Sequence, residues 1–445
     1  MRRRSCIQEY ARYTSLNVLG MIGLSCYILA DTYFVSKGLG GDGLAALNLA
    51  IPIYSFIHGS GLMLGMGGAT HYAISRGQNN SKGANEMFTH TVLGALVLSV
   101  LFMLAGGFFS MPITVLLGAD SEVAAMTNIY LKVILLFAPA FMMNDVLLCF
   151  VRNDGNPRLS MIAMLGGSLS NIVLDYLFIF PFQMGIFGAV LATGLAPVIS
   201  ILLLSGHVLK RRQGFRFKTG SFRPRCLLSI VSLGVPSLVA ELSSGIVMIT
   251  FNILILRLNG NVGVAAYGVI ANLSLVLIAV YTGIAQGAQP LVSRAYGRGN
   301  KRQIAQILRY ALVTMGVVSC LVYGLVFIFA GPIAGIFNEA GDMAFQNIAV
   351  CGLRVYFTAA PFVGFNIVIS SFFTSTEKAV PAQLIAVIRG IILIVPMALI
   401  LSALAGLAGV WLAFPVTEGA VCIVGIGYCV LKIRRRKQEL SMIDG

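Results

Sequence analysis

A succession of long apolar runs constrains this chain more than any other feature. A helix that crosses a bilayer needs about 20 mostly apolar residues, and twelve such runs follow one another along the sequence. They cover about 14–36, 44–72, 88–110, 126–150, 160–181 and 186–209, then about 227–256, 263–292, 306–330, 346–373, 382–404 and 410–431. The runs are apolar throughout rather than alternating, which favours helices over the strands of a membrane barrel.

The composition of the 445-residue chain also indicates an integral membrane protein and excludes a soluble fold. Only 11% of its residues are charged, against about 25% in typical soluble proteins. The formal net charge of +15 does not indicate nucleic-acid binding, because the basic residues are spread over short gaps between apolar runs. We expect an all-α polytopic protein whose partner is the lipid bilayer and not nucleic acid.

The charges in the gaps predict the orientation of the chain. If the N-terminus is cytoplasmic, 25 of the 31 Lys and Arg residues fall on the cytoplasmic side, and 7 of these lie within 210–226. The gaps on the opposite side contain only Lys37 and Arg257 as basic residues. We predict a multi-pass protein of the plasma or inner membrane with both termini in the cytoplasm and an uncleaved first span.

The two halves of the chain repeat one another. Gly-Leu-Ala-Ala at 43–46 returns as Gly-Val-Ala-Ala at 263–266, and the glycine-rich stretch 185–192 returns at 406–413. Six spans bring the chain back to the same side, so the halves are expected to be parallel repeats related by an axis along the membrane normal.

This pattern predicts four segments. They are an N-terminal six-helix bundle at 1–209, a basic cytoplasmic linker at 210–226, a C-terminal six-helix bundle at 227–431 and a basic cytoplasmic tail at 432–445. Two homologous bundles that face each other across a cleft are typical of a transporter in which one bundle rocks against the other.

Several motifs resemble the MATE (multidrug and toxic compound extrusion) family. The first half has Arg-Asn-Asp-Gly-Asn-Pro at 152–157, the stretch 171–179 and Gly-Ile-Phe-Gly at 185–188; the second has Gln-Gly-Ala-Gln-Pro-Leu at 286–291 and Gly-Val-Trp-Leu-Ala-Phe-Pro at 409–415. Pro236 with Glu241 is most similar to the MepA-like bacterial branch. The resemblance covers nearly the whole chain and implies the MATE fold, with twelve transmembrane helices in two pseudo-two-fold-related six-helix bundles.

The resemblance also implies a function. MATE proteins are secondary active antiporters that export amphipathic, often cationic, drugs or metabolites in exchange for H⁺ or Na⁺ by alternating access. No cofactor is expected apart from the coupling ion, and the chain is expected to act as a monomer. Neither the substrate class nor the ion follows from composition or spacing.

Acids inside the spans are candidate functional residues, because an ionisable side chain in the bilayer is costly and usually functional. Asn171 and Asp175 are four residues apart and share one helix face, while Asp31 and Thr193 lie on other spans. Their carboxylate, carboxamide and hydroxyl oxygens suit a proton or Na⁺. In the MATE family, the matching residues form a cation site in the N-terminal bundle. A polar network that only fixes helix packing is the alternative.

Four further residues are candidates for a substrate site or a secondary proton site: Glu241, Asp145, Met63 and Gln286. Glu241 follows Pro236 by about one helical turn, and Asp145 lies near the cytoplasmic end of the fourth span. Methionine suits adaptable binding surfaces, although any single methionine such as Met63 more often fills the core.

The remaining polar residues of the spans are given structural roles. Arg389 is expected to pair with backbone carbonyls or an acid, and Glu418 to serve packing or gating. His58, His71 and His90 have no metal-ligand spacing and are expected to be hydrogen-bonded helix residues. The eight cysteines include no C-x-x-C motif and are expected to be small buried hydrophobes.

Three other classes of protein fit the sequence less well than a drug exporter does. A lipid-linked precursor flippase of the same broad superfamily is the alternative function, but it would need buried basic residues to hold anionic headgroups. An enzyme is not expected, because the chain has no H-E-x-x-H, G-x-S-x-G or G-x-x-x-x-G-K-[ST] motif. An ion channel is disfavoured because no filter-like repeat is present.

Overall fold

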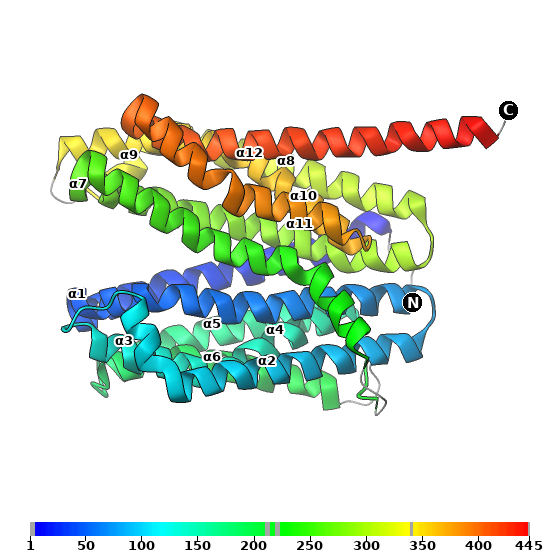
Figure 1. Cartoon of the computed structure of the whole chain (residues 1–445), viewed down its shortest axis with the longest axis horizontal. Coiled ribbons are helices and arrows are strands. Elements are labelled where there is room, and N and C mark those ends of the chain that lie inside the picture. The colour runs from blue at the N-terminus through cyan, green and yellow to red at the C-terminus, as the bar shows by residue number, and fades with distance from the viewer. Residues whose placement is uncertain (1–4, 210–213, 219–222, 339–340, 444–445) are drawn as a thin grey trace. The chain divides into compact units, whose positions relative to one another are not determined.

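The computed structural model describes residues 5–209, 214–218, 223–338 and 341–443, and these residues form helices and no strand (Figure 1). Parts of the predicted linker (210–213 and 219–222), residues 1–4 and residues 444–445 lie outside the described ranges.

The helices follow one another along the whole chain. They are α1 (Cys6–Gly77), α2 (Ser81–Leu116), α3 (Ala124–Leu136), α4 (Ala138–Asn153), α5 (Pro157–Ile179), α6 (Gly185–Leu209), α7 (Pro224–Gly297), α8 (Lys301–Ile336), α9 (Met343–Tyr356), the 3₁₀ turn η1 (Phe357–Ala359), α10 (Ala360–Ser375), α11 (Ala379–Val387), the π-helical η2 (Ile388–Ile392) and α12 (Ile394–Ile443).

Eight helical stretches of the described chain are long and apolar enough to cross a membrane, and the pair α3 and α4, bent by 48°, is a ninth. Pro139 lies in the first turn of α4. A proline is tolerated there because the first N–H groups of a helix have no partner within it, and its ring favours a bend from α3. Three of the eight stretches are much longer than one span: α1, α7 and Ala379–Tyr428. Each contains a glycine with non-helical dihedral angles that divides it into two of the predicted spans. Together these stretches account for all twelve predicted spans.

The breaks in α1 and α7 are the same local structure. Gly40 has φ 68° and ψ −156°, and Gly260, 220 positions later, has φ 60° and ψ −156°. A side chain would disfavour this left-handed region, which glycine adopts readily. Four further pairs of residues with positive φ are matched at nearly the same spacing: 79 with 299, 118 with 341, 155 with 377 and 185 with 406. The repeat in the sequence is therefore a repeat of backbone conformation.

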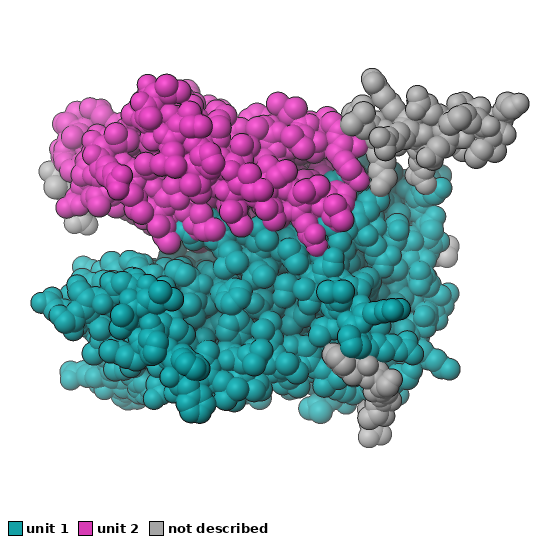
Figure 2. All heavy atoms as spheres, in the orientation of Figure 1, with its two compact units in different colours: residues 1–245, 282–311, 371–379 teal, residues 246–281, 312–370, 380–445 magenta. Residues whose placement is uncertain are grey.

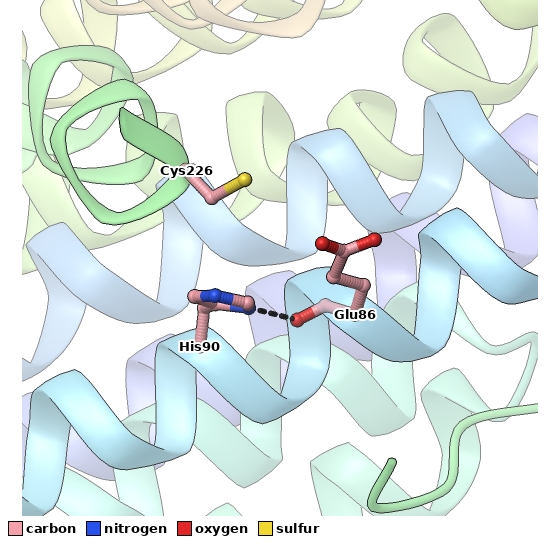
Figure 3. A group of neighbouring side chains, drawn as sticks. All are labelled: Glu86, His90 and Cys226. Carbon is pink, nitrogen blue, oxygen red and sulfur yellow. Dashed lines mark hydrogen bonds between the residues drawn. The ribbon is translucent and has the colours of Figure 1, made fainter. Parts of the chain in front are cut away.

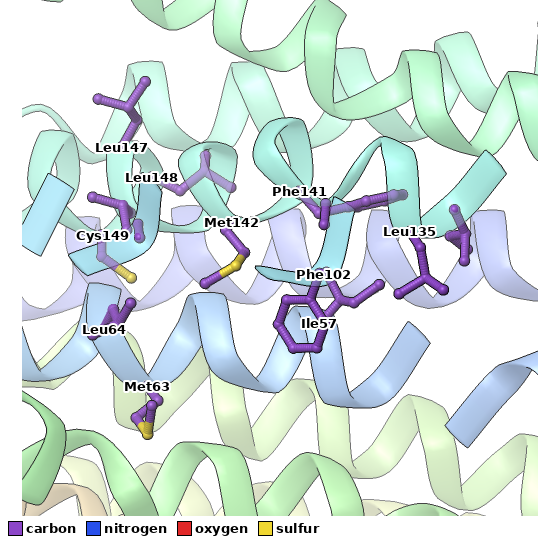
Figure 4. Packing of buried hydrophobic residues seen from close by; sticks show 14 of the residues in the cluster. Ile57, Met63, Leu64, Phe102, Leu135, Phe141, Met142, Leu147, Leu148 and Cys149 are labelled. Carbon is purple, nitrogen blue, oxygen red and sulfur yellow. The ribbon is translucent and has the colours of Figure 1, made fainter. Parts of the chain in front are cut away.

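The chain divides into two compact units, each assembled from separate stretches of sequence (Figure 2). Unit 1 comprises 1–245, 282–311 and 371–379; unit 2 comprises 246–281, 312–370 and 380–445. The core of unit 1 is a continuous apolar cluster in which Ile57 of α1, Phe102 of α2, Leu135 of α3 and Met142 of α4 are buried (Figure 4).

Unit 2 has a small core of its own, in which buried side chains of α7, α8 and α9 pack together. Its members are Ala266, Val269, Ala334, Phe345 and Ala349.

Candidate functional site

The predicted cation-site residues lie in unit 1, and all four are buried. Asp31 of α1 is 7% exposed, Asn171 and Asp175 of α5 are both 0% exposed, and Thr193 of α6 is 5% exposed. The carboxyl groups of Asp31 and Asp175 lie close enough to interact directly with each other. The fold therefore brings together two acids that are 144 positions apart in the sequence.

The polar atoms of this cluster are short of partners. Oδ1 of Asp31, both carboxylate oxygens of Asp175 and both side-chain atoms of Asn171 are buried without a hydrogen-bond partner in the described structure. Among the ion pairs of the described residues, none includes Asp31 or Asp175. Buried polar groups are almost always satisfied. This set of unpartnered oxygens fits a shared proton or a small hard cation such as Na⁺.

Two tyrosines that were not among the predicted site residues also belong to this cluster. The hydroxyl of Tyr130 on α3 lies within hydrogen-bonding range of Thr193 and close to both carboxylates. Tyr27 precedes Asp31 by four residues and so shares its helix face, and its hydroxyl lies 2.9 Å from that of Tyr54. The i, i+4 spacing was the available signal for Tyr27.

Asp145 and Glu241, predicted as secondary sites, lie in a neighbouring group of unit 1, next to Tyr54, whose hydroxyl contacts that of Tyr27. Oδ2 of Asp145 lies 3.0 Å from Nδ1 of His58, so His58 takes part in an ionic group. The expectation that His58 is only a hydrogen-bonded helix residue left out this partner, which is 87 positions away in the sequence. Glu241 interacts electrostatically with both His58 and Asp145.

Gln286 and Met63 lie elsewhere in unit 1. Oε1 of Gln286 accepts a hydrogen bond of 2.8 Å from Nη1 of Arg152, whose side chain is buried and also donates to Oδ1 of Asn17 at 2.9 Å. Met63 is 7% exposed and borders an apolar groove of about 250 Å³. The other residues of that groove are Leu64, Leu93, Gly94, Val97, Leu98, Leu101, Leu227 and Val231. Their predicted substrate roles remain predictions.

In unit 2, the buried acid Glu418 has a partner for each of its carboxylate oxygens. Glu418 is 2% exposed; its Oε1 lies 2.6 Å from Nε of Arg389, and its Oε2 accepts a hydrogen bond of 2.7 Å from Nδ2 of Asn366. The prediction that Arg389 pairs with an acid is confirmed. Both oxygens of this carboxylate have a partner, one a guanidinium and one an amide, which is the arrangement expected of a structural ion pair.

The described part of the linker is attached to unit 1. Phe215 is 5% exposed and packs its ring 4.6 Å from that of Phe88. The N–H of Gly214 donates to Asp154, which also accepts from Tyr72 and lies 3.1 Å from Nε2 of His207. Burial raises the pKa of Asp154, but hydrogen bonds from these three partners outweigh that effect and hold the pKa below its usual range.

Glu86, His90 and Cys226 form the one group of the described residues whose ligand atoms lie within metal-binding range, all within 4.8 Å of one another (Figure 3). The group already has protein partners. Nδ1 of His90 bonds the carbonyl of Glu86 at 2.8 Å, and Nε2 accepts the N–H of Arg223 at 2.9 Å. Oε1 of Glu86 lies 3.1 Å from Nη1 of Arg223. These contacts attach the end of the linker to α2.

Comparison with known proteins agrees with this architecture. The MatE family model matches residues 18–177 and 236–400, one stretch in each half of the chain. The chain belongs to the MATE family. It is thus a multi-pass membrane protein of a multidrug efflux transporter family, and MATE proteins are transport proteins.

Individual relatives cover almost the whole length. The multidrug export protein MepA of Staphylococcus saprophyticus is 27% identical over 423 residues, which are 94% of this chain and 92% of that protein. A crystal structure of MATE in complex with MaL6 gives a TM-score of 0.91 at 25% identity and covers 98% of both chains. The predicted MATE resemblance and its MepA-like branch are confirmed, as is the MATE fold.

One structural neighbour is described as having a different function. It is a MOP superfamily transporter from Pyrococcus furiosus, with a TM-score of 0.89 at 25% identity, and the match covers 98% of this chain and 97% of that chain. The reverse polarity of its binding pocket is said to suggest the different function. The shared fold therefore leaves the charge of the substrate undecided, and the buried side chains of this chain must be considered instead.

Proposed function

We propose that the chain is an antiporter that exports amphipathic organic cations in exchange for H⁺ or Na⁺, with the coupling ion held by Asp31, Asn171, Asp175 and Thr193. One observation supports this most strongly: Asp31 and Asp175 face each other in the interior of unit 1 and have no ion-pair partner among the described residues. An uncompensated carboxylate in the bilayer costs roughly 3 kcal/mol on insertion scales. A bound proton or Na⁺ removes that cost for the pair.

The geometry gives each residue a role. The carboxylates of Asp31 and Asp175 provide the charge, while Asn171, on the face of Asp175, and Thr193 add neutral oxygens. Two adjacent carboxylates favour uptake of one cation between them. Loading this pair removes negative charge from unit 1, so ion binding and binding of a cationic substrate oppose each other. That opposition is what antiport requires.

The oligomeric state, membrane and orientation of the transporter are part of this proposal. The chain acts as a monomer in the plasma or inner membrane, without nucleic acid and with no cofactor besides the coupling ion. Both termini and the linker at 210–226 are cytoplasmic, which the concentration of 25 of 31 basic residues on one side supports. A cysteine placed in the linker should resist an impermeant thiol reagent added to intact cells, and efficient labelling would overturn this topology.

A lipid-linked precursor flippase is the second candidate, and Arg152 is the observation in its favour. Its guanidinium is buried and donates to neutral oxygens of Asn17 and Gln286 rather than to an acid. An anionic headgroup would suit such a side chain. The balance favours cation export, because Arg389 pairs with Glu418 while Asp31 and Asp175 have no basic partner in the part of the chain that the structure describes.

Transport by the purified protein in proteoliposomes tests the proposal. Ethidium uptake should follow an imposed gradient of one ion, H⁺ or Na⁺, and should cease when that gradient is absent. Transport of an anionic lipid-linked substrate with no ethidium transport would instead support the flippase.

A further inference from the structure

A second ionic group lies in unit 1 on α1, α4 and the first part of α7. Nδ1 of His58 is 3.0 Å from Oδ2 of Asp145, and the two side chains are 15% and 4% exposed. Tyr54, one helical turn before His58, stacks its ring parallel to the imidazole, with 5.8 Å between centroids and an interplanar angle of 3°. The ion pair and the stacked ring together fix the orientation of the imidazole.

Two glycines of α1 permit the acids to approach His58. A Cβ atom at Gly61 would lie 2.6 Å from Oδ2 of Asp145, and a Cβ atom at Gly59 would lie 3.1 Å from Cβ of Glu241. Larger residues at these positions would push α4 and α7 away from α1. The acids from the two other helices are thus brought to the same turn of α1.

The charges of the group do not balance. Two carboxylates face one imidazole, and Asp145 forms the direct ion pair with it. Glu241 is partly exposed and belongs to no ion pair among the described residues. The pairing of Asp145 with His58 leaves Glu241 as the carboxylate of this group without a counter-charge among the described residues.

The neighbourhood of this charge is apolar and aromatic. Phe141 packs edge-on against Tyr54 with 5.5 Å between ring centroids, and Leu238 lies against Gly59 beside Glu241. A single carboxylate beside aromatic and aliphatic side chains suits a ligand with one positive charge and a large apolar body.

We propose that His58, Asp145 and Glu241 form a second ionic site, which takes an amphipathic organic cation and in which Glu241 is the carboxylate that recognises it. This inference rests on the proposed export of such cations. Asp145 is a positioning residue: by pairing with His58, it prevents the imidazolium from neutralising Glu241.

Equilibrium binding of tetraphenylphosphonium to the purified full-length protein in nanodiscs, without any ion gradient, tests the site. Glu241→Gln should weaken binding by about tenfold or more, because it removes the charge that faces the ligand. Glu122→Gln, at an exposed loop acid, is the matched control and should leave the affinity unchanged. Glu241→Asp should retain measurable binding, which separates loss of charge from loss of fold.

Variants of the pair test the positioning role. Asp145→Asn should weaken binding because His58 then turns its charge toward Glu241. Adding His58→Gln to Asp145→Asn should restore affinity to near the wild-type value, whereas a purely structural ion pair predicts further loss.

The outcomes separate this inference from the proposed function. Binding by the wild type that Glu241→Gln leaves unchanged overturns the second site and leaves cation export standing. Failure of the wild type to bind or transport any organic cation overturns the proposed function itself. A double variant weaker than Asp145→Asn overturns the positioning role.

Discussion

Glu418 in the second half of the chain and Asp175 in the first half are both buried carboxylates, but their surroundings differ. Arg389 lies 2.6 Å from Glu418, and Asn366 donates to its second oxygen. Asp175 interacts with the carboxyl group of Asp31 and has no basic partner among the described residues. Glu418 is thus paired with a basic side chain, whereas in the proposed function Asp31 and Asp175 share an exchangeable proton or Na⁺.

The backbone does not account for this difference. Both halves have the same break, at Gly40 and at Gly260, and four further pairs of matched left-handed residues. The two halves thus share a framework and differ in which side chains it buries. This difference is why we propose that ion exchange belongs to the first half and structural support to the second.

Asp154, the C-cap residue of α4, offers a third environment. Its oxygens accept hydrogen bonds from Tyr72 and the N–H of Gly214, and one lies 3.1 Å from Nε2 of His207. Donors stabilise its charge as the guanidinium does for Glu418. Four variants test the contrast between these environments, from the largest expected effect to the smallest.

Replacing Asp175 should have the largest effect. Asp175→Asn keeps the shape but removes the charge, so gradient-driven ethidium export in proteoliposomes should fall to background. The free energy of unfolding in detergent should rise by about 1–3 kcal/mol, because one repelling buried charge is gone. Asp42→Asn, at an exposed acid, is the control and should change neither quantity. Wild-type export by both Asp175→Asn and Asp31→Asn would show that the coupling site is elsewhere.

Glu418→Gln should act on stability rather than on coupling. The change leaves Arg389 partly buried without its counter-charge, and we expect a loss of about 2–4 kcal/mol in unfolding free energy, measured by thermal unfolding. Adding Arg389→Gln should recover part of that loss, since no unpaired charge remains. If Glu418→Gln is as stable as the wild type but uncouples transport, the assignment of the two halves is reversed.

Thr193→Val should have a smaller effect on coupling. It removes one neutral oxygen from the cluster, so the affinity for the coupling ion should fall by about 1 kcal/mol, or roughly fivefold, with the maximal transport rate retained. The dependence of transport on ion concentration measures this shift. Thr32→Val is a matched control on α1, because Thr32 is exposed and its hydroxyl donates only to the carbonyl of Ile28. An equal shift in both variants would exclude Thr193 as a ligand.

Asp154→Asn should have the smallest effect, and it should depend on pH. Because the folded state lowers the pKa of Asp154, its contribution to stability is present above the unfolded pKa of about 3.9 and is lost as the pH falls through the lower folded pKa. The variant should be about 1 kcal/mol less stable at neutral pH, with the difference narrowing below about pH 4. Unfolding measured across this range gives the comparison, and a difference constant with pH would contradict it.

The sequence predicted the helices and their repeat because apolar length and matched glycines are local signals. It also selected Asn171 and Asp175 as neighbours, since four residues place two side chains on one helix face. It did not show that His58 pairs with Asp145, because that contact depends on α1 and α4 packing closely at Gly61. The predicted roles of Met63 and Gln286 have no such local signal and stay predictions.

By itself, the sequence determined that this chain is a helical membrane protein built from two repeated halves, because hydrophobic length and backbone freedom are properties of short stretches. The tertiary structure decided which buried charge meets which partner. The sequence predicted an acidic or backbone partner for Arg389, but only the packing of η2 beside α12 identified that partner as Glu418. Asp31 and Asp175 became a pair with no basic partner among the described residues for the same reason. Electrostatic interactions fall with distance in space, and separation along the chain does not set that distance.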